Sequence, residues 1–363
     1  MKIALKNVNV LPARTWNRLG INEADFCVEP AGTTKFGGET VSPLPEGVEK
    51  TEKPFPLEKL ETGMGREAAE FVEKNRTCGV SLRVSAGTKA EKPVILSYRL
   101  DNKNPEAVDL TEITAEENSE ITVIQCYRSE EGLTGFHGGL TKLYASKGAA
   151  IHLIQVQLLG GSCAHFSDVG AFAADDAAID VVQAELGGKT ALSGVKTQLD
   201  GFRSRLDMNS IYFGDSSRKI DLNYVVRHIG RKTKSEIHLG GALLDESQKT
   251  FRGTIDFVRG SKQAVGHESE FNLLFSPKVR NRTAPLILCE EEDVEGQHAA
   301  STGKIDANRL FYLMSRGLSE ADARRLLIEA QFRPVISRIP NEEVKNEITK
   351  YMEARLSRIE SMG

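Results

Sequence analysis

The residues best suited to chemistry lie close together near the C-terminal end of the sequence. Cys289 is followed by the acidic run Glu290–Asp293, which contains Glu292, and then by His298. A thiolate, a carboxylate and an imidazole within ten residues could supply ligands to iron. The acidic run also has a simpler interpretation, because such runs usually form solvated turns. Cys289, Glu292 and His298 are therefore the candidate metal ligands.

The remaining sequence shows no recognised catalytic motif. The five cysteines are an odd, scattered set, which fits reduced thiols better than a disulfide framework. The sequence contains no Cys-x-x-Cys pair, no complete Gly-x-x-x-x-Gly-Lys-Ser/Thr phosphate loop, no Gly-x-Ser-x-Gly elbow and no dinucleotide fingerprint. We therefore expect a protein that is not a conventional enzyme and that binds no nucleotide itself.

Composition and charge exclude several classes of function. The chain is 40% hydrophobic and 27% charged, as in ordinary soluble globular proteins. Its 47 basic and 51 acidic residues give a net charge of -4 without a strongly basic stretch, so we expect no nucleic-acid partner. No apolar run of 18 residues occurs, and the N-terminal residues lack the core of a signal peptide. We therefore expect a cytoplasmic protein without a membrane segment.

The candidate ligands follow a long region with the pattern of β-strands. From Cys78 to about Phe275, short alternating runs are interrupted every ten or so residues by Gly, Asp, Asn or Ser. Three segments are similar to one another, and a looser copy follows; they begin at Ile121, Ile151, Ile179 and Ile220, with spacings of 30, 28 and 41 residues. A repeat of this length in strands favours a β-solenoid. A β-sandwich is the alternative, because its strands also recur at short intervals.

Helical segments are predicted on both sides of the β region. Leu57–Asn75 has apolar residues at helical spacing and is predicted as one helix. Three helices are predicted near the C-terminus: one capped by Asp306 and ended by Gly317, one following Ser319, and one following Pro340. We therefore divide the chain into an N-terminal segment (1–76), a β core (77–297) and a C-terminal helical domain (298–363).

Two stretches of this C-terminal region carry a resemblance to a known family. Glu291–Asp306, which reads EEDVEGQHAASTGKID, and Leu310–Ser319, which reads LFYLMSRGLS, closely resemble the C-terminal signature of the SufB/SufD family of iron-sulfur cluster assembly scaffold proteins. The resemblance implies a mainly β fold, a right-handed parallel β-helix flanked by helices. It also implies a SufC-type ATPase and a second SufB/SufD-like subunit as partners, with a transient iron-sulfur cluster at the subunit interface.

The resemblance also assigns roles to residues. His298 matches the histidine that both SufB-like and SufD-like sequences carry, although a purely structural interface histidine is the alternative. The catalytic cysteine of SufB-like sequences is matched here by Val279, which makes the chain look SufD-like or like the short single-component members. The family's C-terminal helices receive SufC. The candidate partner-binding residues are therefore Phe311, Tyr312, Arg316 and Leu326.

A second class of function fits the same fold. Parallel β-helices also include carbohydrate-active lyases and hydrolases that act through residues gathered on one face. Those enzymes are usually exported with a signal peptide, and a helical C-terminal tail has no role in them. A carbohydrate-active enzyme is therefore the alternative to the scaffold.

Overall fold

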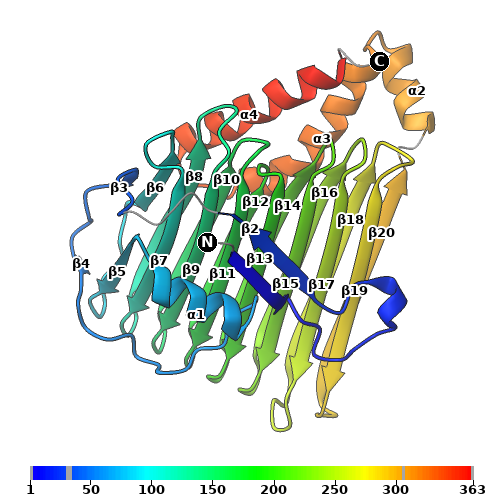
Figure 1. Cartoon of the computed structure of the whole chain (residues 1–363). Helices are drawn as coiled ribbons and strands as arrows, with labels where there is room; N and C mark the ends of the chain where they lie inside the picture. The colour runs from blue at the N-terminus through cyan, green and yellow to red at the C-terminus, as the bar shows by residue number, and fades with distance from the viewer. Residues whose placement is uncertain (1–2, 30–34, 305–306, 361–363) are drawn as a thin grey trace.

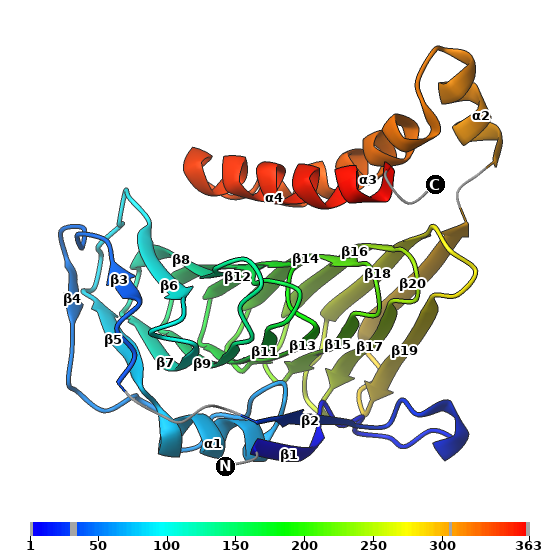
Figure 2. The ribbon, with the colours of Figure 1, turned by 45° about the horizontal axis from the view of Figure 1, so that its top comes forward.

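The computed structural model describes residues 3–29, 35–304 and 307–360. Within these residues, two nine-stranded sheets face each other and form the long sides of a β-solenoid (Figures 1 and 2). From β5 onward successive strands alternate between the sheets, and beyond the first strand of each sheet all neighbours are parallel. The predicted parallel solenoid is confirmed, and the β-sandwich alternative is wrong.

The two sheets are named after their last strands. The β20 sheet contains β3 (Glu39–Val41), β6 (Val94–Leu100), β8 (Glu120–Ser129), β10 (Ala150–Leu158), β12 (Ala178–Glu185), β14 (Arg205–Gly214), β16 (Lys234–Leu243), β18 (Ala264–Leu274) and β20 (Val294–Lys304). The β19 sheet contains β4 (Val48–Lys50), β5 (Cys78–Val84), β7 (Glu106–Ala115), β9 (Phe136–Ala145), β11 (Ala164–Ala173), β13 (Thr190–Leu199), β15 (Lys219–His228), β17 (Gln248–Phe257) and β19 (Arg280–Cys289).

The sequence repeat corresponds to the coils of the solenoid. Ile121, Ile151 and Ile179 stand side by side on β8, β10 and β12. The looser copy was assigned wrongly, because Ile220 lies on β15 in the opposite sheet. The neighbour of Ile179 on the next coil is Leu206, 27 residues later. The error arises because strands of both sheets alternate apolar and polar residues, so the pattern alone does not distinguish the sheets.

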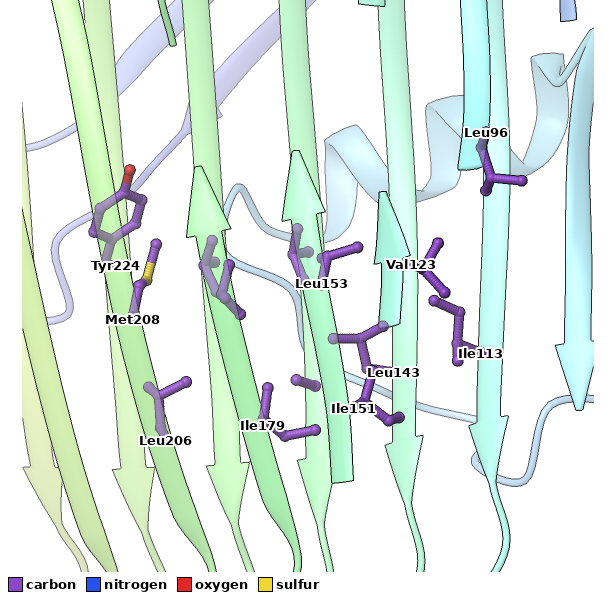
Figure 3. Close-up of a cluster of buried hydrophobic side chains, with 14 of the residues drawn as sticks. Leu96, Ile113, Val123, Leu143, Ile151, Leu153, Ile179, Leu206, Met208 and Tyr224 are labelled. Carbon is purple, nitrogen blue, oxygen red and sulfur yellow. The ribbon is translucent and has the colours of Figure 1, made fainter. Parts of the chain in front are cut away.

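Aliphatic side chains from both sheets fill the interior of the solenoid (Figure 3). Leu96 and Val123 come from the β20 sheet and Ile113 and Leu143 from the β19 sheet, and all four are fully buried. Every second residue of a strand points inward, so each coil stacks its apolar side chains on those of its neighbours.

A line of buried polar side chains crosses the same interior. His137 Nε2 lies 2.6 Å from Asp109 Oδ1, and His137 Nδ1 lies 2.9 Å from His165 Nδ1. Burial raises the pKa of Asp109 to about 8 and lowers the pKa of His137 to about 3. Burial thus favours the uncharged forms of Asp109 and His137, and hydrogen bonds join Asp109 to His137 and His137 to His165. The Nε2 atom of His165 faces Glu185 at 3.8 Å.

His228 is a buried histidine whose two ring nitrogens face hydroxyl groups. Its ring nitrogens lie 2.7 Å from Thr233 Oγ1 and 2.9 Å from Ser235 Oγ. Burial lowers the pKa of His228 to about 3, against about 6.5 in an unfolded chain. The unfolded chain therefore binds one more proton at this site below about pH 6.5. The stability that His228 contributes is present above that pH and is lost as the pH falls towards the folded-state value.

Replacing His228 with glutamine is expected to remove this acid sensitivity. The difference in free energy of unfolding between wild type and His228→Gln should shift by about 1.4 kcal/mol per pH unit as the pH falls below 6. Denaturant-induced unfolding of both proteins between pH 4 and 8 measures this difference in the free energy of unfolding. His238→Gln is the control, because the side chain of His238 is about half exposed on β16, the next strand along the chain. Parallel pH profiles for wild type and His228→Gln would contradict the assignment.

Apart from β3 and β4, which join the two sheets, the N-terminal segment covers the outer face of the β19 sheet. It contains the hairpin of β1 (Ile3–Val8) and β2 (Ala24–Val28) and the helix α1 (Arg66–Asn75); a short 3-10 turn, Asn17–Leu19, lies between the hairpin strands (Figure 1). The predicted helix is confirmed from Arg66 onward and is wrong for residues 57–65. Asp168 accepts a hydrogen bond from the Met64 amide at 2.8 Å, and Asn223 donates to the Gly63 carbonyl at 2.7 Å. These contacts with distant strands hold residues 57–65 in an extended conformation.

The C-terminal helices are α2 (Ala307–Ser315), α3 (Glu320–Ile336) and α4 (Glu342–Glu360). Ser319 accepts a hydrogen bond from the Asp322 amide, and Gly317 adopts a positive φ after α2, so these predicted signals are confirmed. Asp306, the predicted cap of α2, lies outside the described residues. Helices α3 and α4 pack their apolar side chains on the outer face of the β20 sheet. Helix α2 stands clear of both sheets (Figure 2).

The end of the β core differs from the predicted division of the chain. The boundary between residues 297 and 298 falls inside β20, which continues to Lys304. The solenoid therefore ends later than expected, and His298 belongs to it. None of the helices in the described residues is long and apolar enough to span a membrane.

Candidate functional site

The last coil, formed by β19 and β20, leaves one end of the solenoid open. Within the described residues, β19 pairs only with β17 and β20 only with β18, so each of the last two strands has one edge without a strand partner. Such an edge presents backbone donors and acceptors to which another chain can pair. The open end lies beside the start of the helical tail (Figure 1).

Strand register identifies which side chains of the last coil face inward. Lys249, Phe251 and Phe257 are buried inward residues of β17, and β19 repeats their positions in the next coil. On β20, the positions next to the buried residues Glu268 and Glu270 face the same interior. The inward residues of the open coil include Thr283, Pro285, Ile287 and Cys289 on β19 and Gly296, His298 and Ala300 on β20.

His298 lies in the middle of β20 and is exposed, directly beside Glu268. Gly253 faces Glu268, because a Cβ atom on Gly253 would lie 1.9 Å from Glu268 Oε2. Pro285 is the neighbour of Gly253 in the next coil. His298 therefore faces Pro285 across the open end.

Cys289 and Glu292 lie away from His298. Cys289 ends β19, four residues beyond Pro285, which corresponds to about 13 Å along the strand. Its Sγ lies 3.0 Å from the Glu291 carbonyl oxygen, and Glu292 is exposed in the turn that follows. No group of three or more His, Cys, Asp or Glu side chains suited to a metal ion occurs in the described residues. The structure thus does not bring the three predicted ligands together within one chain.

A buried charged group lies just behind the open coil, and the sequence analysis missed it. Lys249 is fully buried and forms an ion pair with Glu270. Thr283 Oγ1 lies 2.9 Å from Lys249 Nζ and donates to Glu270 Oε2 at 2.7 Å. Burial raises the pKa of Glu268 to about 8. The signal in the sequence was the presence of charged residues at inward positions of otherwise alternating strands.

The predicted partner-binding residues lie on and near α2. Phe311 and Tyr312 are 72% and 56% exposed, which is unusual for aromatic side chains. The Arg316 guanidinium lies over the Tyr312 ring, 5.2 Å from its centroid. Leu326 is also exposed but belongs to α3. Val279, at the position of the SufB-like cysteine, is partly buried against the core.

Comparison with known proteins shows the family of this fold and site. Residues 98–331 match the family model described as SUF system FeS cluster assembly, SufBD core domain. The chain belongs to the SufBD family. The matched residues include the open coil, α2 and most of α3. The proposed resemblance to SufB/SufD proteins is confirmed, and with it a role for the family in iron-sulfur cluster assembly.

Several SufBD relatives are similar over most of this chain. The iron-sulfur cluster assembly protein SufD of Bacillus subtilis is 25% identical over 280 residues, which cover 77% of this chain and 64% of the relative. A SufBD family protein of Pyrococcus horikoshii is 29% identical over 77% of this chain and 62% of its own length. SufD of Escherichia coli is 24% identical over 76% of this chain and 66% of its own length. This SufBD chain thus spans slightly less than two thirds of the length of these relatives.

Proposed function

We propose that this SufBD protein is a scaffold subunit of the cytoplasmic SUF system and is not itself an enzyme. In this proposal it acts with a SufC-type ATPase and a second SufB/SufD-like subunit, and a transient iron-sulfur cluster forms at the interface between the two SufBD chains. The observation that carries the proposal is the exposed His298 on the last coil, whose outer edge pairs with no other strand of the described residues. Gly296, Ala299 and Ala300 beside it are small enough for another chain to approach closely.

The unpaired edge of β20 supports the pairing of two SufBD chains. Pro285 removes one backbone donor from β19, whereas β20 contains no proline. Strand β20 is therefore the better edge for pairing with a partner strand. A partner in this position would stand next to His298 and could supply the ligands that one chain does not gather. Cys289 and Glu292 remain secondary candidates, because they lie away from His298 at the end of β19 and in the turn after it.

The exposed side chains of α2 support a separate docking surface for the ATPase. Phe311, Tyr312 and Arg316 are of the types enriched at the centres of protein interfaces. Helix α2 stands beyond the sheets, so a partner can reach these residues without contacting the open coil (Figure 2). ATP hydrolysis would belong to this partner. Membership of the SufBD family argues against the carbohydrate-active alternative.

Reversing the charge of Arg316 is expected to weaken the complex with a SufC-type ATPase about tenfold or more, because the substitution removes a cation from an aromatic docking surface. Light scattering of the chain mixed with SufC, with and without a SufB-like subunit, measures the assembly. Arg333→Glu on α3 is a matched control. Unchanged SufC binding by Arg316→Glu would place the ATPase elsewhere. A chain that stays monomeric with both partners would contradict the scaffold proposal.

A further inference from the structure

Glu268 is the buried carboxyl group next to His298. The two residues are direct neighbours on β18 and β20. Adjacent strands lie about 4.8 Å apart, and both side chains occupy inward positions. The imidazole of His298 therefore lies at the open end of the solenoid, and the carboxylate of Glu268 lies one coil further inside. Thirty residues separate them in the sequence, which is one coil.

Glu268 makes no hydrogen bond or ion pair within the residues that the structure describes, although it is only 5% exposed. Glu270, two residues along the same face, is bound by Lys249 and Thr283. The nearest buried cation is thus already paired with another carboxylate. A buried carboxyl group without a partner is costly, and most native proteins avoid it.

The surroundings of Glu268 hold its carboxylate in place. The missing side chain of Gly253 provides the space for it, since a Cβ atom there would lie 1.9 Å from Oε2. Pro285 lies beside Gly253 in the next coil, and His298 lies beside Glu268. The carboxylate is therefore enclosed by backbone on one side and has the exposed imidazole on the side of the opening.

We propose that Glu268 and His298 together bind one ferrous ion at the open end of the solenoid. This inference rests on the proposed function, in which His298 binds iron, and adds the second ligand from the same chain. A carboxylate oxygen and an imidazole nitrogen are both suitable ligands for Fe²⁺. The ion would be a direct partner for Glu268, whose charge Lys249 attracts without pairing with it, and the partner subunit or water would complete the coordination.

The test is anaerobic calorimetric titration of the full chain with Fe²⁺, alone and mixed with a SufB-like subunit. Glu268→Gln and His298→Ala are each expected to weaken Fe²⁺ binding at least about tenfold, because either change leaves a single ligand. The double variant, which keeps neither ligand, should bind Fe²⁺ no more tightly than the weaker single variant. Without iron, Glu268→Gln should melt at or above the wild-type temperature, because it removes an unpaired buried acid. Glu295→Gln is the control: it changes an exposed carboxylate of β20 that faces outward.

The outcomes separate this inference from the proposed function. If Glu268→Gln binds Fe²⁺ like the wild type while His298→Ala does not, His298 binds iron without Glu268 and only the inference is wrong. If both variants bind like the wild type, the iron role of His298 fails as well. A wild-type chain that binds no Fe²⁺, either alone or with the partner subunit, overturns both.

Discussion

Replacing Arg252 with methionine is expected to lower the free energy of unfolding by about 3–5 kcal/mol. Arg252 lies on β17 and is fully buried under the N-terminal segment. Its Nε donates to the Ile21 carbonyl at 2.5 Å, and its Nη1 lies 2.6 Å from Asp221 Oδ1. Methionine fills a similar volume but leaves the Asp221 carboxylate, which is only 16% exposed, without its cation. The large effect comes from that uncompensated charge.

Denaturant unfolding of wild type and Arg252→Met measures this prediction. The control is Arg227→Met on the neighbouring strand β15, where the arginine is 40% exposed and pairs with Asp256 at 3.2 Å. Ion pairs of this exposure contribute about 1 kcal/mol or less. Adding Asp221→Asn to Arg252→Met should recover part of the lost stability. Equal losses for the two arginine variants would show that the buried pair does not anchor the N-terminal segment.

Replacing His298 with alanine is expected to abolish most cluster formation while costing only about 1 kcal/mol of stability. The side chain is exposed on the open coil, so its removal leaves no cavity. The measurement is anaerobic reconstitution with iron and sulfide in the presence of SufC and a SufB-like subunit. Cluster absorbance and melting temperature are compared for wild type, His298→Ala and Cys289→Ser.

Cys289→Ser distinguishes the two candidate ligands. Cys289 lies about 13 Å along the strand from the position opposite His298, so we expect the serine variant to keep most of its cluster. Loss of the cluster in Cys289→Ser alone would make the thiol the principal ligand. A His298→Ala chain that folds, assembles and holds as much cluster as the wild type would leave His298 with a structural role at the interface.

The solenoid could be predicted from the sequence because its coils repeat similar residues in register. Ile121, Ile151 and Ile179 mark one row of the β20 sheet, and such a row requires strands stacked in parallel. The extended segment 57–65 could not be predicted, because Asp168 and Asn223 hold it from strands more than a hundred residues away. The helical pattern of residues 57–65 reflects only local sequence, and the tertiary contacts override it.

The candidate site was predicted only in part, for a related reason. Cys289 and His298 are close in sequence, yet the turn between them places them on opposite strands at different heights. Glu268 is distant in sequence, yet one coil brings it beside His298. In a solenoid, neighbours in space are residues one coil apart, about 30 positions here, and a search for ligands within a short segment misses them.

Helix α4 fixes the spacing of the coils that it crosses. Glu347 near its start pairs with Arg128 on β8, Tyr351 donates to the Leu159 carbonyl at 2.9 Å, and Arg355 near its end pairs with Asp215 after β14. In a stack of coils, each contact between neighbouring coils allows a small change in their spacing or relative rotation. Because α4 contacts the solenoid at β8 and again after β14, it restricts such changes between these strands. Strands β19 and β20 lie beyond these contacts, so α4 does not brace the end of the solenoid that carries His298, and another chain that pairs with this end would meet coils free to adjust their spacing.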